Sequence, residues 1–421
     1  MEIITTTFAL FVAVPALYLA FLAAVTLLPR QPPPRHKTGD SMRFAVLVPA
    51  HDEELKIGAT LASLSRLHCP PDRFSVHVVA DNCTDATAAV ARGHGACVHE
   101  RNDPRNPGKG AALNWLAREV AAEVTALDAF VMVDADSELS PNFLSVMADH
   151  LRSGAEVVQA LHLVAVCEDR PLVRIRELAF QLTCHLRPLA NAILGGSSGL
   201  QGTGMCFAAT LFPRYSWDES SVVEDGELSL RLIRDGHRVA LAANATVRQA
   251  MPTTFREARS QAVRWERGRF DHVQQALSLM WTGIRRRDRG ALLAAFTALT
   301  PPFSALAAGG ILTLGLAAVL DSRPLAILGL GTLACLLFYA LRGAALGGLR
   351  PGTLLRILLW APLYTAWKLW VFVLAASGVG RGQWTRTNRA ESANARRSSA
   401  IASRDGPTPI KSERGRSQNW K

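Results

Sequence analysis

The hydrophobic residues concentrate in two long regions, one at the start of the chain and one after residue 289. Residues 3–28 carry no charge, and a helix of that length, at about 1.5 Å per residue, exceeds the roughly 30 Å hydrocarbon core of a bilayer. A signal peptide is the alternative, but Glu2 stands where such a peptide is basic, and no small-residue cleavage pattern closes the run. The pattern favours an uncleaved membrane anchor.

Between the two regions, short apolar runs alternate with helical patterns. This alternation predicts an α/β domain with a mostly parallel sheet. The expected strands are 44–48, 76–80, 96–99 and 130–133, and the expected helices are 54–67, 84–94 and 109–120. The sheet is expected to continue through 157–164, followed by a long helical stretch over 173–193 and a glycine-rich break at 195–199.

The second apolar region contains three membrane-like segments, 291–320, 325–346 and 354–377. Three crossings would place the basic tail on the opposite side from the basic, proline-rich segment after the anchor, which conflicts with the positive-inside rule. We therefore expect two crossings here, with 354–377 or the region of Pro301 lying partly in the membrane interface. The hairpin 321–324 would face outward, and the central domain would be cytoplasmic.

The expected domains follow these boundaries. They are a transmembrane helix at 1–28, a basic proline-rich collar at 29–42, a catalytic-type α/β domain at 43–289, a membrane region at 290–378 and a basic disordered tail at 379–421.

The net charge of +11 comes largely from the tail, where basic residues alternate with Ser, Asn and Pro. Anionic lipid headgroups or solvent are the expected partners of that charge. No recognised nucleic-acid-binding module accompanies it, so we expect no nucleic-acid partner. The seven cysteines form no CxxC pair and are odd in number, which indicates reduced thiols in a cytosolic domain.

Carboxylates follow two of the expected strands. Asp134 and Asp136 come directly after the run 130–133, where two hard oxygen ligands suit Mg²⁺ or Mn²⁺. Asp81 follows the run 76–80 and could bind a nucleotide base or ribose, or cap the helix that begins near Thr84. Because ligands of parallel sheets bind beyond the carboxyl ends of the strands, these residues are expected to share a cleft. Upstream, Asp52 is expected to be an ordinary helix N-cap.

Lys109 lies in a glycine-containing turn at a helix start, which favours a diphosphate or sugar contact, although a plain capped turn is equally consistent. Gly202 and Thr203 belong to a tight turn that could let the backbone approach a ligand or could serve packing alone. The adjacent acids Glu224 and Asp225 could supply a general base, or could simply complement the dipole of the helix that they begin.

Gln261, Arg264 and Trp265 share one face of a helical stretch at spacings of three and four residues. An indole stacks on a sugar ring, and a guanidinium can bind phosphate through two hydrogen bonds. An interfacial helix with Trp at the membrane surface is the alternative.

Taken in order, these motifs resemble family 2 glycosyltransferases, in particular the membrane-embedded synthases of cellulose, chitin, hyaluronan and poly-N-acetylglucosamine, over residues 44–269. The resemblance implies a GT-A fold, a UDP-sugar donor and inversion at the anomeric carbon. It also implies donor binding by Asp81 and Asp134, metal binding by Asp134 and Asp136, catalysis by Asp225, and acceptor or diphosphate binding by Gln261, Arg264 and Trp265. Beside these, the residues themselves offer further candidates: Pro49, His51, Glu53 and Lys109 for donor binding, Glu224 for catalysis with Asp225, and Gly202 and Thr203 for acceptor or diphosphate binding.

The sequence departs from the family pattern at His51 and Asp52, where many relatives carry Tyr and Asn. Residues 383–387 also resemble bacterial exopolysaccharide glycosyltransferases. The resemblance implies a multi-pass protein of the inner (plasma) membrane that builds a surface or extracellular polysaccharide with an export or assembly subunit as a further partner. Single transfer to a lipid-linked acceptor is the rival activity, and a non-catalytic scaffold or polysaccharide-binding subunit is the alternative of a different class.

Overall fold

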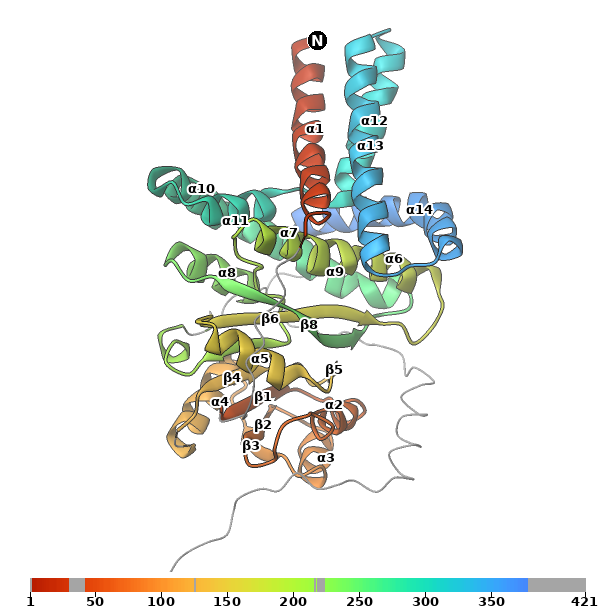
Figure 1. Ribbon diagram of the computed structural model, residues 1–421. Helices are drawn as coiled ribbons and strands as arrows, with labels where there is room; N and C mark the ends of the chain where they lie inside the picture. The colour runs from red at the N-terminus through yellow and green to blue at the C-terminus, as the bar shows by residue number, and fades with distance from the viewer. Residues whose placement is uncertain (1, 30–41, 125, 216, 218–223, 378–421) are drawn as a thin grey trace, which may run out of the picture.

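An eight-stranded mixed sheet forms the body of the protein, and a group of apolar helices stands on one end of it (Figure 1). The computed structural model describes residues 2–29, 42–124, 126–215, 217 and 224–377. The strand order is β3-β2-β1-β4-β7-β6-β8-β5. The expected collar and tail fall almost entirely outside the described residues.

The first half of the sheet is parallel, as the apolar runs predict. β1 pairs in parallel with β2 and β4, and β2 pairs in parallel with β3. Strands buried on both faces read as continuous apolar runs, which is why they are recognisable in the sequence. The elements are β1 (Phe44–Ala50), α2 (Ile57–Leu64), β2 (Phe74–Asp81), α3 (Thr87–Gly93), β3 (Cys97–Arg101), α4 (Lys109–Glu123) and β4 (Ala129–Met132).

The second half of the sheet is mixed. β7 pairs antiparallel with both β4 and β6, β8 pairs in parallel with β6, and β5 pairs antiparallel with β8. The sheet is thus less uniformly parallel than the alternation of elements suggests. Its elements are β5 (Ser137–Leu139), α5 (Phe143–Arg152), β6 (Val157–Ala165), β7 (Met205–Ala208), a short 3-10 turn (Phe212–Arg214), α8 (Glu224–Arg234) and β8 (Val239–Ala250).

The expected helical stretch over 173–193 is confirmed as one continuous rod. It consists of α6 (Pro171–Phe180), a π-helical turn (Gln181–Leu186) and α7 (Arg187–Ile193). The rod lies between the sheet and the apolar helices (Figure 1). Tyr339 joins it to these helices, because its hydroxyl donates to the Leu182 carbonyl at 2.8 Å and accepts from Arg187 Nε at 2.8 Å.

The remaining helices follow β8 in the chain, with α1 before β1. α1, α12 and α13 pack against one another and stand upright on the body, whereas α14 runs across their base (Figure 1). The bounds are α1 (Glu2–Val25), α9 (Phe255–Asp271), α10 (Val273–Arg286), α11 (Arg289–Leu299), α12 (Phe303–Val319), α13 (Arg323–Leu346) and α14 (Pro351–Ala376).

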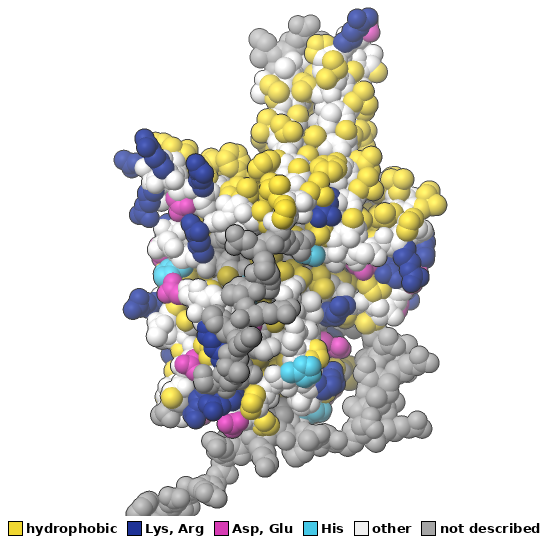
Figure 2. Space-filling view, in the orientation of Figure 1, with side chains coloured by type: hydrophobic (Ala, Val, Ile, Leu, Met, Phe, Trp, Pro, Cys, Tyr) yellow, Lys and Arg dark blue, Asp and Glu magenta, His cyan; other side chains and the backbone are white. Residues whose placement is uncertain are grey.

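Three of these helices are long and apolar enough to cross a membrane, namely the segments Thr5–Val25, Arg323–Leu346 and Pro351–Ala376. α11 and α12 together form a fourth candidate that is bent by 69°. Glycines allow close packing in the upright group: a Cβ on Gly309 would lie 2.8 Å from Val12 Cγ2, and one on Gly329 would lie 2.8 Å from Leu314. Hydrophobic side chains predominate along the upright helices, where charged ones are seen mainly at the far tip, and more Lys and Arg side chains lie on the body below (Figure 2).

One local expectation is wrong, and one alternative is excluded. Asp52 does not cap α2, which begins at Ile57; its backbone has φ +51°, and its Oδ1 accepts from the Thr84 backbone N–H at 2.7 Å. Asp81 does not cap α3, because Arg101 binds its carboxylate. Asp52 joins two loops and Asp81 joins the ends of β2 and β3, so neither carboxylate caps the start of a helix.

Candidate active site

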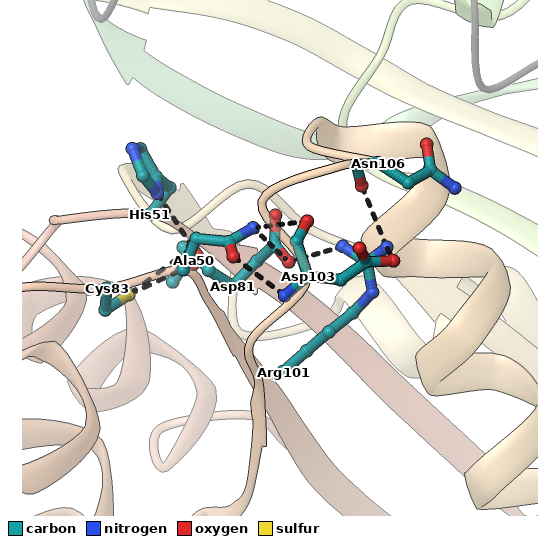
Figure 3. Close-up of polar contacts among 8 residues, drawn as sticks. Ala50, His51, Asp81, Cys83, Arg101, Asp103 and Asn106 are labelled. Atoms are coloured by element: carbon teal, nitrogen blue, oxygen red, sulfur yellow. Dashed lines mark hydrogen bonds and ion pairs between the residues drawn. The ribbon is translucent and has the colours of Figure 1, made fainter.

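Asp81 ends β2 in a buried ion pair with Arg101. Arg101 NH1 lies 2.5 Å from Asp81 Oδ1, and both side chains are 7% exposed. On the other side, His51 Nδ1 lies 2.7 Å from the Asp81 carbonyl oxygen. Figure 3 shows these three residues meeting where β1, β2 and β3 end. Asp81 is therefore held in one orientation at the carboxyl edge of the sheet.

Arg101 also organises the loop before α4. Its NH2 donates to Asp103 Oδ2 at 3.1 Å and to the Asn106 carbonyl at 2.8 Å (Figure 3). The Asn82 side chain closes the same ring, since its oxygen accepts from the Asp103 backbone N–H at 2.8 Å. No sequence motif points to Arg101; its charge at the end of an expected strand, two residues before an acid, is the only available signal.

Pro49 and Glu53 flank this region. Pro49 lies in β1 opposite Val79 of β2. The Glu53 backbone N–H donates to Thr87 Oγ1 at 2.8 Å, and its carboxylate accepts from Lys56 Nζ at 3.1 Å. The predicted donor-binding residues of β1 and β2 therefore lie together at one edge of the sheet.

Asp134 and Asp136 follow β4 and meet one amide. Gln249 of β8 places its Nε2 2.5 Å from Asp136 Oδ1 and 3.4 Å from Asp134 Oδ2. The Asp134 backbone N–H donates to the hydroxyl of the fully buried Thr203 at 3.1 Å, which fixes the start of the loop. Two carboxylates converging on one point form an oxygen donor set that fits Mg²⁺ or Mn²⁺.

Lys109 connects the carboxylate pair Asp134 and Asp136 to the turn before β7. Its ammonium nitrogen lies 2.6 Å from Asp134 Oδ1 and donates to the Gly202 carbonyl at 2.5 Å. Burial by itself would lower the pKa of Lys109, but the carboxylates of Asp134, Glu224 and Asp225 outweigh it and hold that pKa above its ordinary value. The cation is thus fixed at the amino end of α4, a favourable place for phosphate.

Glu224 and Asp225 begin α8 on the other side of Gly202. A Cβ on Gly202, whose φ is +82°, would lie 3.2 Å from Asp225 Oδ2 and 3.8 Å from Lys109 Nζ. Burial raises the pKa of Glu224 to about 7 against the opposing effect of Lys109, and burial likewise raises the pKa of Asp225. A carboxyl group with such a pKa can take up a proton near neutral pH.

Two histidines that the sequence motifs do not single out border the site. Burial lowers the pKa of His162 on β6 to about 4, so its ring is neutral at pH 7 beside Asp134. Burial also lowers the pKa of His272, which lies against Gly226: a Cβ there would be 2.5 Å from His272 Cε1. Neither histidine lies at a sequence spacing from the site carboxylates that would have identified it.

The predicted motif of Gln261, Arg264 and Trp265 lies on α9 and packs against α6. Gln261 Oε1 accepts from Arg176 NH2 at 2.9 Å, and the Arg176 guanidinium lies 5.6 Å from the centre of the Trp265 ring. Gln261 and Trp265 therefore share a face, as the spacing predicts, but both contact Arg176, which the sequence analysis did not identify. Arg264 forms no ion pair within the part of the chain that the structure describes. Phe180 packs between the motif and the sheet. The centre of its ring lies 6.0 Å from that of Trp265 on α9 and 5.1 Å from that of His162 on β6.

These contacts unite most of the predicted site residues. A cation, a convergent carboxylate pair and two acids of raised pKa surround Gly202, and the Asp81 cluster lies on the neighbouring strands. The arrangement can bind a diphosphate through Lys109 and a cation, and can accept a proton on the opposite side. Thr203 and Gln261 are buried and support other residues rather than facing open space.

Comparison with known proteins agrees with this chemistry. Residues 42–268, slightly more than half of the chain, match the family described as "Glycosyltransferase like family 2". The chain is 25% identical over 270 residues to the probable glycosyltransferase YdaM of Bacillus subtilis, covering 58% of this chain and 59% of that protein. It is 27% identical over 274 residues to the beta-monoglucosyldiacylglycerol synthase of Synechocystis sp., covering 60% and 54%. The chain thus spans less than two thirds of the length of these relatives.

A solved structure shares the fold. The mannosyltransferase PcManGT from Pyrobaculum calidifontis, in complex with GDP-Man and Mn²⁺, has a TM-score of 0.53 and 19% identity, covering 81% of this chain and 98% of that one. This similarity confirms the GT-A fold, and the match to the family model shows the family. The chain belongs to glycosyltransferase family 2.

Proposed function

We propose that this protein is a membrane-bound, inverting glycosyltransferase that uses a UDP-sugar and Mg²⁺ or Mn²⁺, and that it extends a surface or extracellular polysaccharide. The observation that carries this proposal is the meeting of Lys109, Asp134 and Asp225 around Gly202. A diphosphate-binding cation, a metal ligand and a base are the three elements that sugar transfer from a nucleotide donor requires.

The donor occupies the edge formed by β1, β2 and β4. Asp81 accepts hydrogen bonds from the base or ribose, with His51 and Arg101 holding it in place. Pro49 and Glu53 line the same side. A divalent cation bound by Asp134 and Asp136 would neutralise charge on the departing diphosphate. Lys109, already at the amino end of α4, binds the same diphosphate.

Asp225 acts on the acceptor. It removes the proton from the acceptor hydroxyl as that oxygen bonds to the anomeric carbon, and the bond to the diphosphate breaks on the opposite face, with UDP as the leaving group. Direct displacement of this kind inverts the anomeric configuration. Glu224, whose pKa of about 7 leaves it partly protonated at neutral pH, limits the negative charge beside Asp225.

The membrane arrangement uses α1, α12 and α13 as crossings. α14 lies across their base with Leu358, Leu359 and Trp370 exposed, which suits the membrane interface. The hairpin 321–324 then faces outward, and the catalytic domain lies in the cytoplasm beneath the plasma membrane. An even number of crossings after α1 suits the positive-inside rule, because basic residues are frequent in the sequence both directly after α1 and beyond α14.

Transfer to a lipid-linked acceptor is the second candidate. Within the described residues, three helices, or four if the bent pair counts as one span, can cross a membrane. So few membrane-spanning helices would hardly be enough to form a channel around an emerging polymer. In addition, one relative is named as a glycolipid synthase. A non-catalytic scaffold is disfavoured, because a polysaccharide-binding subunit needs neither the carboxylate pair nor Asp225.

The test is release of UDP by the purified protein in nanodiscs, with a panel of UDP-sugars, Mg²⁺ or Mn²⁺, and either oligosaccharide or lipid acceptors. Metal-dependent turnover with one donor, lost in Asp136→Ala, supports the proposal, and the acceptor that stimulates turnover separates its two forms. Turnover that is equal without metal or in Asp136→Ala contradicts it. Parallel measurements with GDP-sugars test the choice of nucleotide.

A further inference from the structure

Two histidines face each other on the edge strand β3 and its neighbour β2, away from the active site. His77 lies in β2 and His99 in β3, and His77 Nδ1 is 3.2 Å from His99 Nε2. His77 is four residues before Asp81, which at about 3.3 Å per residue separates it from the donor site by roughly 13 Å along the strand. In Figure 1 these strands lie at the end of the body opposite the upright helices.

The carboxylate of Glu123 completes the cluster. Glu123 is the last residue of α4, which covers this face of the sheet, and one ligand atom from each of the three residues lies within 4.8 Å of the others. His77 is 3% exposed, His99 is half-buried and Glu123 is exposed. The set therefore reaches from the interior of the sheet to the protein surface.

The distances suit a transition metal. Two nitrogen ligands at about 2.0–2.1 Å from a tetrahedral Zn²⁺ are roughly 3.3 Å apart, close to the separation of the two rings. Two histidines, one carboxylate and a water form a ligand set that Zn²⁺ accepts. Imidazole nitrogens favour Zn²⁺ over Mg²⁺, which distinguishes this cluster from the all-oxygen pair at Asp134 and Asp136.

The surroundings already orient both rings. His77 Nε2, the nitrogen that does not face His99, hydrogen-bonds Ser75 Oγ at 2.9 Å. The Trp115 ring of α4 packs edge-on against His99 at 6.3 Å between centres. A hydrogen bond on the second nitrogen sets the tautomer of a metal-ligating histidine, and such support contributes to metal affinity.

We propose that His77, His99 and Glu123 form a second metal site, selective for Zn²⁺ or a similar transition-metal ion. The ion takes the place of the hydrogen bond between the two rings and links β2, β3 and α4. Its role is to stabilise this edge of the donor-binding half of the domain, so it contributes to folding stability rather than to the transfer step. The proposal is independent of the sugar and the acceptor.

The experiment measures Zn²⁺ binding to chelator-treated, full-length protein in detergent, by competition with a chromophoric chelator. The measurement is made in Asp136→Asn, so that the carboxylate pair no longer competes for the ion. Co²⁺ absorption in the visible range reports tetrahedral nitrogen and oxygen coordination. The variants are His99→Gln and Glu123→Gln, and the matched control is Glu119→Gln, an exposed acid one turn earlier on α4.

We expect one equivalent of Zn²⁺, a higher unfolding temperature with the ion bound, and loss of the Co²⁺ spectrum in His99→Gln. Glu123→Gln should weaken binding about tenfold or more, because it removes a ligand, whereas Glu119→Gln should leave it unchanged. Absence of Zn²⁺ binding to the folded protein, or equal binding in Glu123→Gln and Glu119→Gln, overturns the proposal. Since Glu123 is exposed, that comparison holds even if His99→Gln fails to fold.

Discussion

The ammonium nitrogen of Lys109 lies 2.6 Å from Asp134 Oδ1, so the first residue of α4 is paired with the first acid after β4. The same nitrogen donates to the Gly202 carbonyl, and a Cβ on Gly202 would lie 3.2 Å from Asp225 Oδ2. Lys109 therefore contacts Asp134 of the carboxylate pair and is attracted electrostatically by the candidate base Asp225. Substitutions of Lys109 and its neighbours should show which residues contribute to binding the donor and which act on the acceptor.

Lys109→Met should weaken donor binding. Hydrogen bonds from a charged donor contribute about 1.5–3 kcal/mol, so we expect the KM for the nucleotide sugar to rise on the order of 10-fold to 100-fold. Steady-state kinetics with the preferred donor provide the measurement. Arg152→Met on α5, which removes an ion pair with Asp149, is the control. An unchanged KM in Lys109→Met would show that Lys109 does not contact the diphosphate.

Gln249→Leu should weaken metal binding without touching either metal ligand. The amide holds Asp134 and Asp136 toward one point, and removing such support costs about 10–100-fold in metal affinity. Mn²⁺ titration followed by electron paramagnetic resonance measures this loss directly. Gln275→Leu, which removes an amide donor to Glu227 on α8, should have no effect. Equal Mn²⁺ affinity in the two variants would exclude this role for Gln249.

Much of this arrangement is predictable because the motifs follow buried strands. The run before Asp134 is apolar on both faces and the run before Asp81 is apolar except for His77, which identifies both as buried parallel strands, and the carboxyl ends of such strands meet at one edge. The helix start at Lys109 and the shared face of Gln261 and Trp265 follow from local spacing in the same way. These inferences need only short-range sequence information.

The partners of these residues were not predictable in this way. Gln249 lies 113 residues from Asp136 and reaches it because β8 pairs antiparallel with β5. Arg176 reaches Gln261 over 85 residues. β7 is only four residues long and carries Met205 and Cys206, which reads as part of a turn. Asp52 reads as a helix cap because the loop contact with Thr84 has no local signature.

Gly202→Ala should impair catalysis more than a glycine change elsewhere. A left-handed backbone conformation costs a non-glycine residue roughly 1–2 kcal/mol, and the added methyl group would also press on Asp225 Oδ2. Gly236→Ala is a matched control, because Gly236 has φ +94° and nothing within 4 Å of the added atom. We expect similar losses of thermal stability in both variants but a lower kcat in Gly202→Ala alone. Equal kcat values in the two variants would show that the position of Asp225 does not depend on Gly202.

Glu224→Gln should raise stability at alkaline pH. Burial raises the pKa of Glu224 to about 7, so the folded protein holds this proton more tightly than the unfolded chain. The resulting stabilisation is fully present below the unfolded pKa of about 4.3 and is lost as the pH rises through 7. The difference in unfolding temperature between Glu224→Gln and the wild type should therefore grow between pH 5 and pH 8.

The control for this comparison is Glu119→Gln, which changes an exposed acid on α4. Its unfolding temperature should follow that of the wild type across the same pH range. A constant difference between Glu224→Gln and the wild type from pH 5 to pH 8 would contradict the raised pKa.

The measurement that tests the central claim most directly is a comparison of donor binding and sugar transfer in Asp225→Asn. General base catalysis contributes about 10²–10⁴-fold, so transfer should fall by at least that lower factor. The affinity for the UDP-sugar in the presence of Mg²⁺ or Mn²⁺, measured by calorimetry, should stay at the wild-type value. Transfer at the wild-type rate, or a loss of donor affinity as large as the loss of transfer, would contradict the assignment of Asp225 as the base.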